Sequence, residues 1–181
     1  MAVEQTSPAG LKPKVGSVAS LFVSRWDAKV ASKVPEPLQN QLGIAIAKRT
    51  YKTYRALLDS PRWQRVYNGG ARPQRLLWAS TGTKDPKVSD VLYIKALAAP
   101  FTVNTIPEAT LNALADHGRL SGLLQADGGD GEQVLAQFTA AGVDLQALAV
   151  RLQTEGAASF VKSWHSLMAV IASRSATLAS T

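Results

Sequence analysis

Ser20 and Arg25 are the residues whose types and spacing best suit a phosphate group. They lie within six positions of each other, at the end of a short apolar run over residues 18–23. Arginine offers a planar fork of N–H donors that can contact a phosphate twice, and serine adds a short hydroxyl donor. Judged from these residues alone, Arg25 is better explained as a surface ion-pair partner of Asp27, because exposed ion pairs are common.

Other chemistries find little support. The sequence has no cysteine, which excludes thiol catalysis, disulfides and cysteine-ligated zinc. His117 and His165 are far apart, and neither has a second ligand at helical spacing. Residues 127–132 lack the alternating carboxylates of a calcium loop, and no glycine-rich stretch fits a P-loop or a dinucleotide motif. We therefore predict neither a metal nor a cofactor.

The formal charge of +7 is unevenly distributed along the chain. Residues 1–100 hold 16 Lys and Arg against 6 Asp and Glu, whereas residues 101–181 hold 4 against 7. An anionic partner should therefore meet the first part. Nucleic acid is disfavoured because no basic cluster with aromatic residues or binding motif occurs, so small anionic substrates fit better. Neither a signal peptide nor a membrane span is evident, which favours the cytoplasm and no membrane partner.

Three short apolar segments are predicted to be buried strands, at residues 18–23, 75–79 and 101–104. Helical patterns separate them, so we expect an α/β fold with parallel strands. Either an open doubly wound sheet or a section of a (β/α)8 barrel would satisfy this pattern. The first strand has no preceding partner, and an exposed apolar edge is a liability, which predicts a missing upstream segment. Residues 1–16 are expected to be irregular, and residues 17–181 to form the partial domain.

The expected helices show capping signals and apolar stripes. A long amphipathic helix is predicted over residues 38–57, and Ser60 followed by Pro61 predicts the start of the next. Residues 89–98 are expected to be helical, and Thr105 with Glu108 forms a capping box before a helix ending at His117. Residues 131–174 are predicted to be mostly helical, with two core or lid stripes: Val134, Leu135 and Phe138, then Phe160, Trp164, Leu167, Met168 and Ile171.

The segment Ala-Ser-Leu-Phe-Val-Ser-Arg-Trp-Asp at residues 19–27 resembles the Ser-x-Phe-Val-x-Arg signature of transaldolases. Residues 72–86 are similar to strand seven and its loop in the longer bacterial and plant-like members. The resemblance covers roughly residues 14–174 and corresponds to the C-terminal part of the family. It implies the C-terminal section of a (β/α)8 TIM barrel, with about three parallel strands and additional C-terminal helices.

The resemblance also implies site residues. In the family, the Ser and Arg of the signature hold the substrate's phosphate and its Phe lines the pocket, which implies these roles for Ser20, Arg25 and Phe22. Ser80 is placed in the same pocket. Many members have an arginine directly after the Ala-Ser pair, whereas here three residues intervene before Lys84. We expect Lys84 to supply positive charge to the phosphate without the bidentate fork.

The family's catalytic lysine is not found. Transaldolases form a Schiff base through a strand-four lysine in a Val-Lys-Ile-Pro-Ala-Thr-like motif, and nothing similar occurs in this sequence. Lys48, Lys52 and Lys162 fall on predicted helices, whereas a Schiff-base lysine must be desolvated to present a free amine. We therefore assign no catalytic residue and expect this chain to be inactive by itself.

The expected function is transfer of a dihydroxyacetone unit between sugar phosphates of the pentose phosphate pathway. The expected substrates are fructose 6-phosphate, sedoheptulose 7-phosphate, erythrose 4-phosphate and glyceraldehyde 3-phosphate. The missing N-terminal half-barrel or a second copy of the chain would be its protein partner. Two alternatives stay open: a noncatalytic phosphosugar-binding or interaction protein, and a basic polyanion-binding module whose affinity falls steeply with salt.

Overall fold

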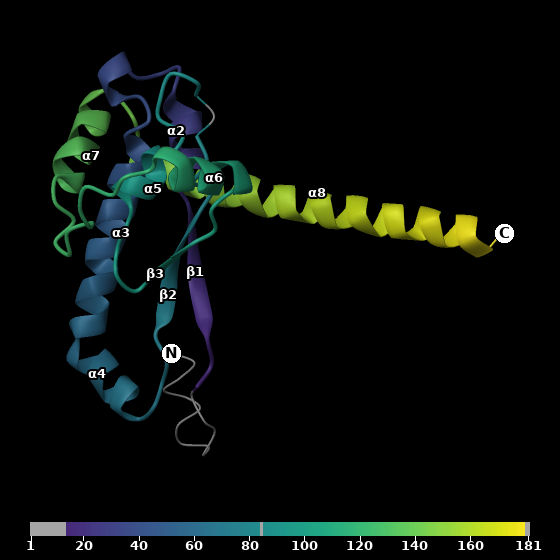
Figure 1. Ribbon diagram of the computed structural model, residues 1–181, viewed down its shortest axis with the longest axis horizontal. Coiled ribbons are helices and arrows are strands. Elements are labelled where there is room, and N and C mark those ends of the chain that lie inside the picture. The colour runs from purple at the N-terminus through teal and green to yellow at the C-terminus, as the bar shows by residue number, and fades with distance from the viewer. Residues whose placement is uncertain (1–13, 84, 180–181) are drawn as a thin grey trace. The chain divides into compact units, whose positions relative to one another are not determined.

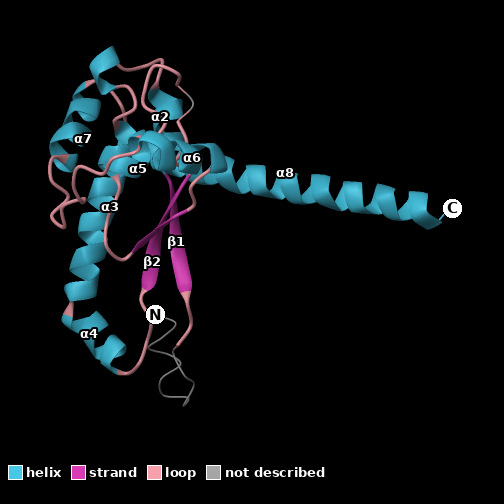
Figure 2. Cartoon of the chain, viewed as in Figure 1, coloured by secondary structure: helices cyan, strands magenta, loops and turns pink. Residues whose placement is uncertain are grey.

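The computed structural model describes residues 14–83 and 85–179. Within them, three strands form one parallel sheet in the order β1-β2-β3 (Figure 2). These strands are β1 (Ser17–Phe22), β2 (Gln74–Ala79) and β3 (Thr102–Asn104). The predicted α/β class with three parallel strands is confirmed. Neighbouring strands follow one another in the sequence, as adjacent strands of a (β/α)8 barrel do.

Helices connect successive strands, and within the described chain three further helices come after the last strand in the sequence (Figure 1). Ser60 begins one of the connecting helices as predicted, because its side chain accepts the Trp63 backbone N–H at 3.2 Å and Pro61 occupies the first helical position. The helices are α2 (Val23–Val30), the 3₁₀ turn η2 (Glu36–Leu38), α3 (Leu42–Asp59), α4 (Pro61–Asn68), α5 (Leu92–Ala96), α6 (Glu108–His117), α7 (Gly131–Ala140) and α8 (Leu145–Ala179).

A hydrophobic core lies between one face of the sheet and helices α3 and α5. Trp78 of β2 is 1% exposed there, and its indole N–H donates to the Leu97 carbonyl at 3.1 Å. The cluster of buried residues comprises Val23, Ile44, Ala47, Tyr51, Tyr54, Leu76, Trp78, Tyr93 and Leu97. Leu76 and Trp78 are two positions apart along β2, so their side chains point to the same face of the sheet. The core therefore occupies only that face.

Helix α2 packs closely on the start of α3, and a glycine makes this possible. A Cβ atom on Gly43 would lie 2.5 Å from the Val23 carbonyl oxygen and 2.6 Å from Oδ2 of Asp27. Both distances are far below van der Waals contact. Any larger residue would therefore push α2, which directly follows β1, away from its position.

The predicted capping box of α6 is wrong. Pro107 occupies the N-cap position and no side chain caps this helix. The Thr105 hydroxyl instead donates to the Trp78 carbonyl at 3.3 Å, beside the bond from the Thr105 backbone N–H to the same carbonyl. Thr105 therefore ties the end of β3 to β2, and this tertiary contact replaces the local cap that the sequence predicted.

The structure divides into two compact units, residues Met1–Ala141 and Gly142–Thr181. In the first, Leu135 and Phe138 of the α7 stripe are buried as predicted, both at most 1% exposed, whereas Val134 is half-buried. In the second, the predicted core stripe is exposed along α8. The described part of this unit is essentially one helix, so the unit offers no other element to cover the stripe. No helix in the described residues is both long and apolar enough to cross a membrane.

Candidate functional site

Polar side chains gather where the three parallel strands end. Ser24 follows β1, Ser80 and Thr81 follow β2, and Asn104 ends β3. The hydroxyl oxygens of Ser24 and Ser80 are 2.7 Å apart, and the Thr81 hydroxyl donates to Oδ1 of Asn104 at 2.8 Å. These contacts join the ends of neighbouring strands. In parallel α/β folds this edge of the sheet is where ligands bind.

Ser20 and Phe22 lie on the sheet face opposite the hydrophobic core. Leu21, between them, packs against the core cluster, and side chains alternate along a strand. The register places Ser20 beside Leu77 and Phe22 beside Ala79. Ser20 is exposed and Phe22 is half-buried. The two predicted site residues therefore share one face, as binding of a common ligand requires.

Arg25 reaches back from the first turn of α2 over the ring of Phe22. Its guanidinium carbon lies 4.0 Å from the ring centroid, which is the geometry of a cation–π contact. Such stacking holds the planar guanidinium by one face and leaves its N–H edge available for an oxyanion. The structure thus brings together the predicted phosphate ligand Arg25 and the predicted pocket residue Phe22.

The start of α2 adds favourable electrostatics for an anion. This helix begins at Val23, directly after β1, and its first turn contains no acidic residue. The N-terminus of a helix carries a partial positive charge, although the Ser24 N–H in this turn already donates to the Ser80 carbonyl. Arg25 lies within this same first turn, so its charge and the helix dipole act on the same region.

Asp27 is buried and is not the ion-pair partner of Arg25 that residue types alone favoured. Its carboxylate accepts the Tyr93 hydroxyl at 2.8 Å and the Gly43 backbone N–H at 3.1 Å. Burial raises the pKa of Asp27, opposed by the hydrogen bonds from Tyr93, Gly43 and Leu42. Burial, together with the Asp27 charge, also raises the pKa of Tyr93. Asp27 thus satisfies the first N–H groups of α3 and fixes α2 against it.

Ser80 has a strained backbone at the end of β2. Its φ of 56° lies in the left-handed region that residues other than glycine rarely adopt. Two contacts with Ser24 accompany this conformation: the hydroxyl pair at 2.7 Å and a bond from the Ser24 backbone N–H to the Ser80 carbonyl at 3.1 Å. Backbone strain of this kind concentrates at functional sites.

Comparison with known proteins identifies the family. The family model for Transaldolase/Fructose-6-phosphate aldolase matches residues 2–171. The chain belongs to the transaldolase family. It is 44% identical over 178 residues to a transaldolase of Parafrankia sp. (strain EAN1pec). The matched region covers 93% of this chain and 48% of that protein.

Two further relatives give the same result. A transaldolase of Frankia alni is 43% identical over 94% of this chain and 48% of its own length. A transaldolase of Mycobacterium tuberculosis is 43% identical over 86% of this chain and 44% of its own length. The chain therefore spans about half the length of the curated relatives it matches, and it corresponds to their C-terminal part.

Lys84, the third phosphate ligand predicted from the transaldolase resemblance, lies outside the described residues. Its neighbour Asp85 is fixed by two hydrogen bonds, from the Lys87 backbone N–H at 2.9 Å and from Nδ2 of Asn40 at 3.1 Å. These bonds hold the pKa of the Asp85 carboxyl below its usual range. The loop after β2 is thereby anchored to the turn before α3.

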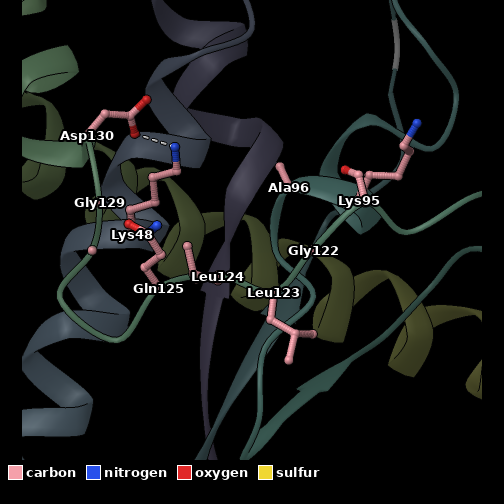
Figure 3. A pocket seen from close by; sticks show the side chains of 11 residues that line it. Lys48, Lys95, Ala96, Gly122, Leu123, Leu124, Gln125, Gly129 and Asp130 are labelled. Atoms are coloured by element: carbon pink, nitrogen blue, oxygen red, sulfur yellow. Dashed lines mark hydrogen bonds and ion pairs between the residues drawn. The ribbon is translucent and has the colours of Figure 1, made fainter.

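A polar pocket of about 450 Å³ lies away from the strand ends (Figure 3). Lys48 of α3, Gln125 and Asp130 contribute to its lining, and the Lys48 ammonium forms an ion pair with the Asp130 carboxylate. This internal pairing offsets the charge that Lys48 could offer to an anionic ligand. In the described residues, no three His, Asp or Glu side chains are grouped as they would need to be to hold a metal ion.

The sequence did not reveal Ser24 or Asp27 as contributors to this region. Ser24 occupies a variable position of the transaldolase signature, and its partner Ser80 is 56 residues away. For Asp27, the residue type suggests only a surface partner of Arg25, whereas this residue is 4% exposed. The available signal was that a serine and an aspartate flank Arg25 directly after a buried strand.

Proposed function

We propose that this chain supplies the phosphate-binding side of a transaldolase site. That site would transfer a dihydroxyacetone unit between sugar phosphates in the cytoplasmic pentose phosphate pathway. Fructose 6-phosphate and sedoheptulose 7-phosphate would act as donors, and erythrose 4-phosphate and glyceraldehyde 3-phosphate as acceptors. The observation that carries the proposal is the stacking of Arg25 on Phe22 at the N-terminus of α2, beside Ser80.

Several contacts support the assignment of Ser20, Phe22, Arg25 and Ser80 to one substrate site. Ser20 and Phe22 share a sheet face, Arg25 stacks on Phe22, and Ser80 bonds to the residue that precedes Arg25. A phosphate placed there would meet a guanidinium, hydroxyl donors and a helix N-terminus, which together form a strong oxyanion environment. Lys84 is proposed to add charge from the loop after β2.

We propose that catalysis needs a lysine from outside this chain. A Schiff-base lysine must be held neutral in a desolvated pocket, where its amine can attack the substrate carbonyl. Lys48 and Lys52 lie on α3 and Lys162 lies on α8, none of them at a strand end. A phosphate site alone binds substrate but opens no covalent path for the transfer.

The partner that we propose is a polypeptide equivalent to the N-terminal half of a transaldolase. Among the described strands β1 has one neighbour, β2, and Val18 on this edge strand is exposed. An apolar groove of about 450 Å³ is lined by residues of β1, β2, α3 and α4 that include Tyr54, Leu57 and Trp63. An open strand edge and an apolar groove are surfaces that further strands and helices bury.

The proposal predicts the outcome of a reconstitution experiment. The chain would be assayed for transfer from fructose 6-phosphate to erythrose 4-phosphate, alone and with the N-terminal half of the Frankia alni relative. We expect turnover only in the mixture. Borohydride reduction with fructose 6-phosphate should trap the adduct on a lysine of the added half. A trapped lysine in this chain would contradict the proposal, as would an inactive mixture whose halves associate.

A further inference from the structure

The hydroxyl groups of Ser24 and Ser80 form a pair whose two members differ in burial. Ser24 is only 9% exposed, whereas Ser80 is half-buried and lies at the start of the loop after β2. Their oxygens are 2.7 Å apart, the usual length of a hydroxyl–hydroxyl hydrogen bond. The pair spans the gap between the ends of β1 and β2, immediately before Arg25.

The number of hydroxyl protons in this pair determines whether it can donate a hydrogen bond to a ligand. Each serine hydroxyl has one proton to donate, and the bond between them uses one. If the buried Ser24 donates to Ser80, the hydroxyl proton of Ser80 is left to donate outward. Donation into Ser80 also polarises its O–H bond and makes it a better donor, because hydrogen bonds in a chain strengthen one another.

The backbone contact between the same residues has a separate effect. The Ser24 N–H donates to the Ser80 carbonyl at 3.1 Å, and Ser80 adopts its left-handed φ of 56° within this arrangement. The backbone bond therefore sets where Ser80 lies, and the hydroxyl bond sets how its side chain is turned. A substitution of the Ser24 side chain removes only the second of these.

We propose that Ser24 is a positioning residue of the phosphate site, which donates to Ser80 and directs the Ser80 hydroxyl proton toward an oxygen of the bound phosphate. This inference rests on the proposed function, because it requires a phosphate beside Arg25. It adds a residue that the transaldolase signature leaves variable.

Phosphate binding by single and double variants tests this role. Inorganic phosphate and fructose 6-phosphate would be titrated into the purified chain, Ser24→Ala, Ser80→Ala and the double variant. A neutral hydrogen bond contributes modestly, so each single variant should bind about three- to ten-fold more weakly. The double variant should bind no more weakly than the weaker single variant, because the two hydroxyls act as one unit.

Ser60→Ala is the matched control for an effect through stability alone. Ser60 caps α4 by accepting the Trp63 N–H, so its replacement lowers the thermal midpoint without touching the strand ends. Its phosphate affinity should equal that of the unmodified chain. Ser24→Ala retains the backbone bond to Ser80, and circular dichroism would verify that it is folded.

The outcomes separate the two claims. If the unmodified chain binds phosphate and Ser24→Ala binds it equally well, the role of Ser24 is wrong while the proposed function stands. Losses that add in the double variant would also overturn the coupling between Ser24 and Ser80. If the unmodified chain binds neither inorganic phosphate nor fructose 6-phosphate, both the inference and the proposed function fail.

Discussion

Replacing Arg25 by alanine is expected to weaken the binding of fructose 6-phosphate by about 10- to 100-fold, because a charge-assisted hydrogen bond is lost. Arg25→Lys should recover only part of the affinity, since an ammonium restores the charge but neither the planar fork nor the stacking on Phe22. Isothermal titration calorimetry of the purified chain would measure both variants. The thermal midpoint should change little, because Arg25 is only partly buried.

Arg72→Ala provides the matched control for the loss of one positive charge. Arg72 is exposed and precedes β2, at the opposite end of the strand from Ser80. Its replacement lowers the net charge equally but should leave the affinity for fructose 6-phosphate almost unchanged. Equal losses for the two variants would mean that general charge, as in a polyanion-binding module, explains the binding instead of a built site.

The second large effect is expected at the buried pair of Asp27 and Tyr93. Tyr93→Phe removes the hydroxyl that donates to the Asp27 carboxylate at 2.8 Å. Hydrogen bonds to charged groups are the stronger ones, so we expect a cost of about 1.5–3 kcal/mol in the free energy of unfolding near pH 7. At low pH the cost should be smaller, because burial raises the pKa of Asp27 and a larger share of its carboxyl is then protonated. Urea unfolding at both pH values measures the difference.

The sign of the pH dependence follows from the raised pKa of Asp27, which burial causes. A carboxyl whose pKa is higher in the folded state binds its proton more tightly there than in the unfolded chain. Its contribution to stability is therefore complete below the ordinary pKa near 3.8 and is lost as the pH rises through the folded-state pKa. Asp27→Asn should abolish this component of the pH dependence.

The same substitution supplies the control for Tyr93. In the Asp27→Asn background, Tyr93→Phe should cost the same free energy at pH 4 and pH 7, because no charge remains to interact with the hydroxyl. A cost of Tyr93→Phe that is independent of pH in the unmodified background would contradict our account of this pair.

The sequence predicted the strands because each is a short apolar run bounded by turn residues. Residues 18–23 and 75–79 were each placed within one position of β1 and β2. Local sequence signals were reliable where neighbouring residues make the expected contact, as Ser60 does when it accepts the Trp63 N–H at the start of α4. They failed at Thr105, because α6 begins only at Glu108 with Pro107 at its N-cap. The Thr105 hydroxyl instead donates to the Trp78 carbonyl, a contact that a capping pattern cannot reveal.

The candidate site was predictable where its residues lie close together in the sequence. Ser20, Phe22 and Arg25 belong to one strand and the turn after it, so a single motif identified them. The pairing of Ser24 with Ser80 joins residues 56 positions apart, and that of Asp27 with Tyr93 joins residues 66 apart. Both depend on how β1 lies beside β2 and how α2 packs on α3, which are tertiary relations that a periodic pattern does not encode.

The apolar stripe of α8 shows a similar limit. Phe160, Trp164 and Leu167 recur at helical spacing, which correctly predicted a helix. Periodicity identifies the face but does not say which surface covers it. Within Gly142–Thr181, these side chains are at least half exposed.

The central claim, that sugar phosphate binds at the carboxyl ends of β1 and β2, is tested most directly by nuclear magnetic resonance. Fructose 6-phosphate would be titrated into the isotope-labelled chain, with fructose as the control. We predict saturable shifts in the amide signals of Phe22, Ser24, Arg25 and Ser80 that require the phosphate group. Shifts centred instead on the Lys48 and Gln125 pocket, or equal shifts with fructose, would contradict the account.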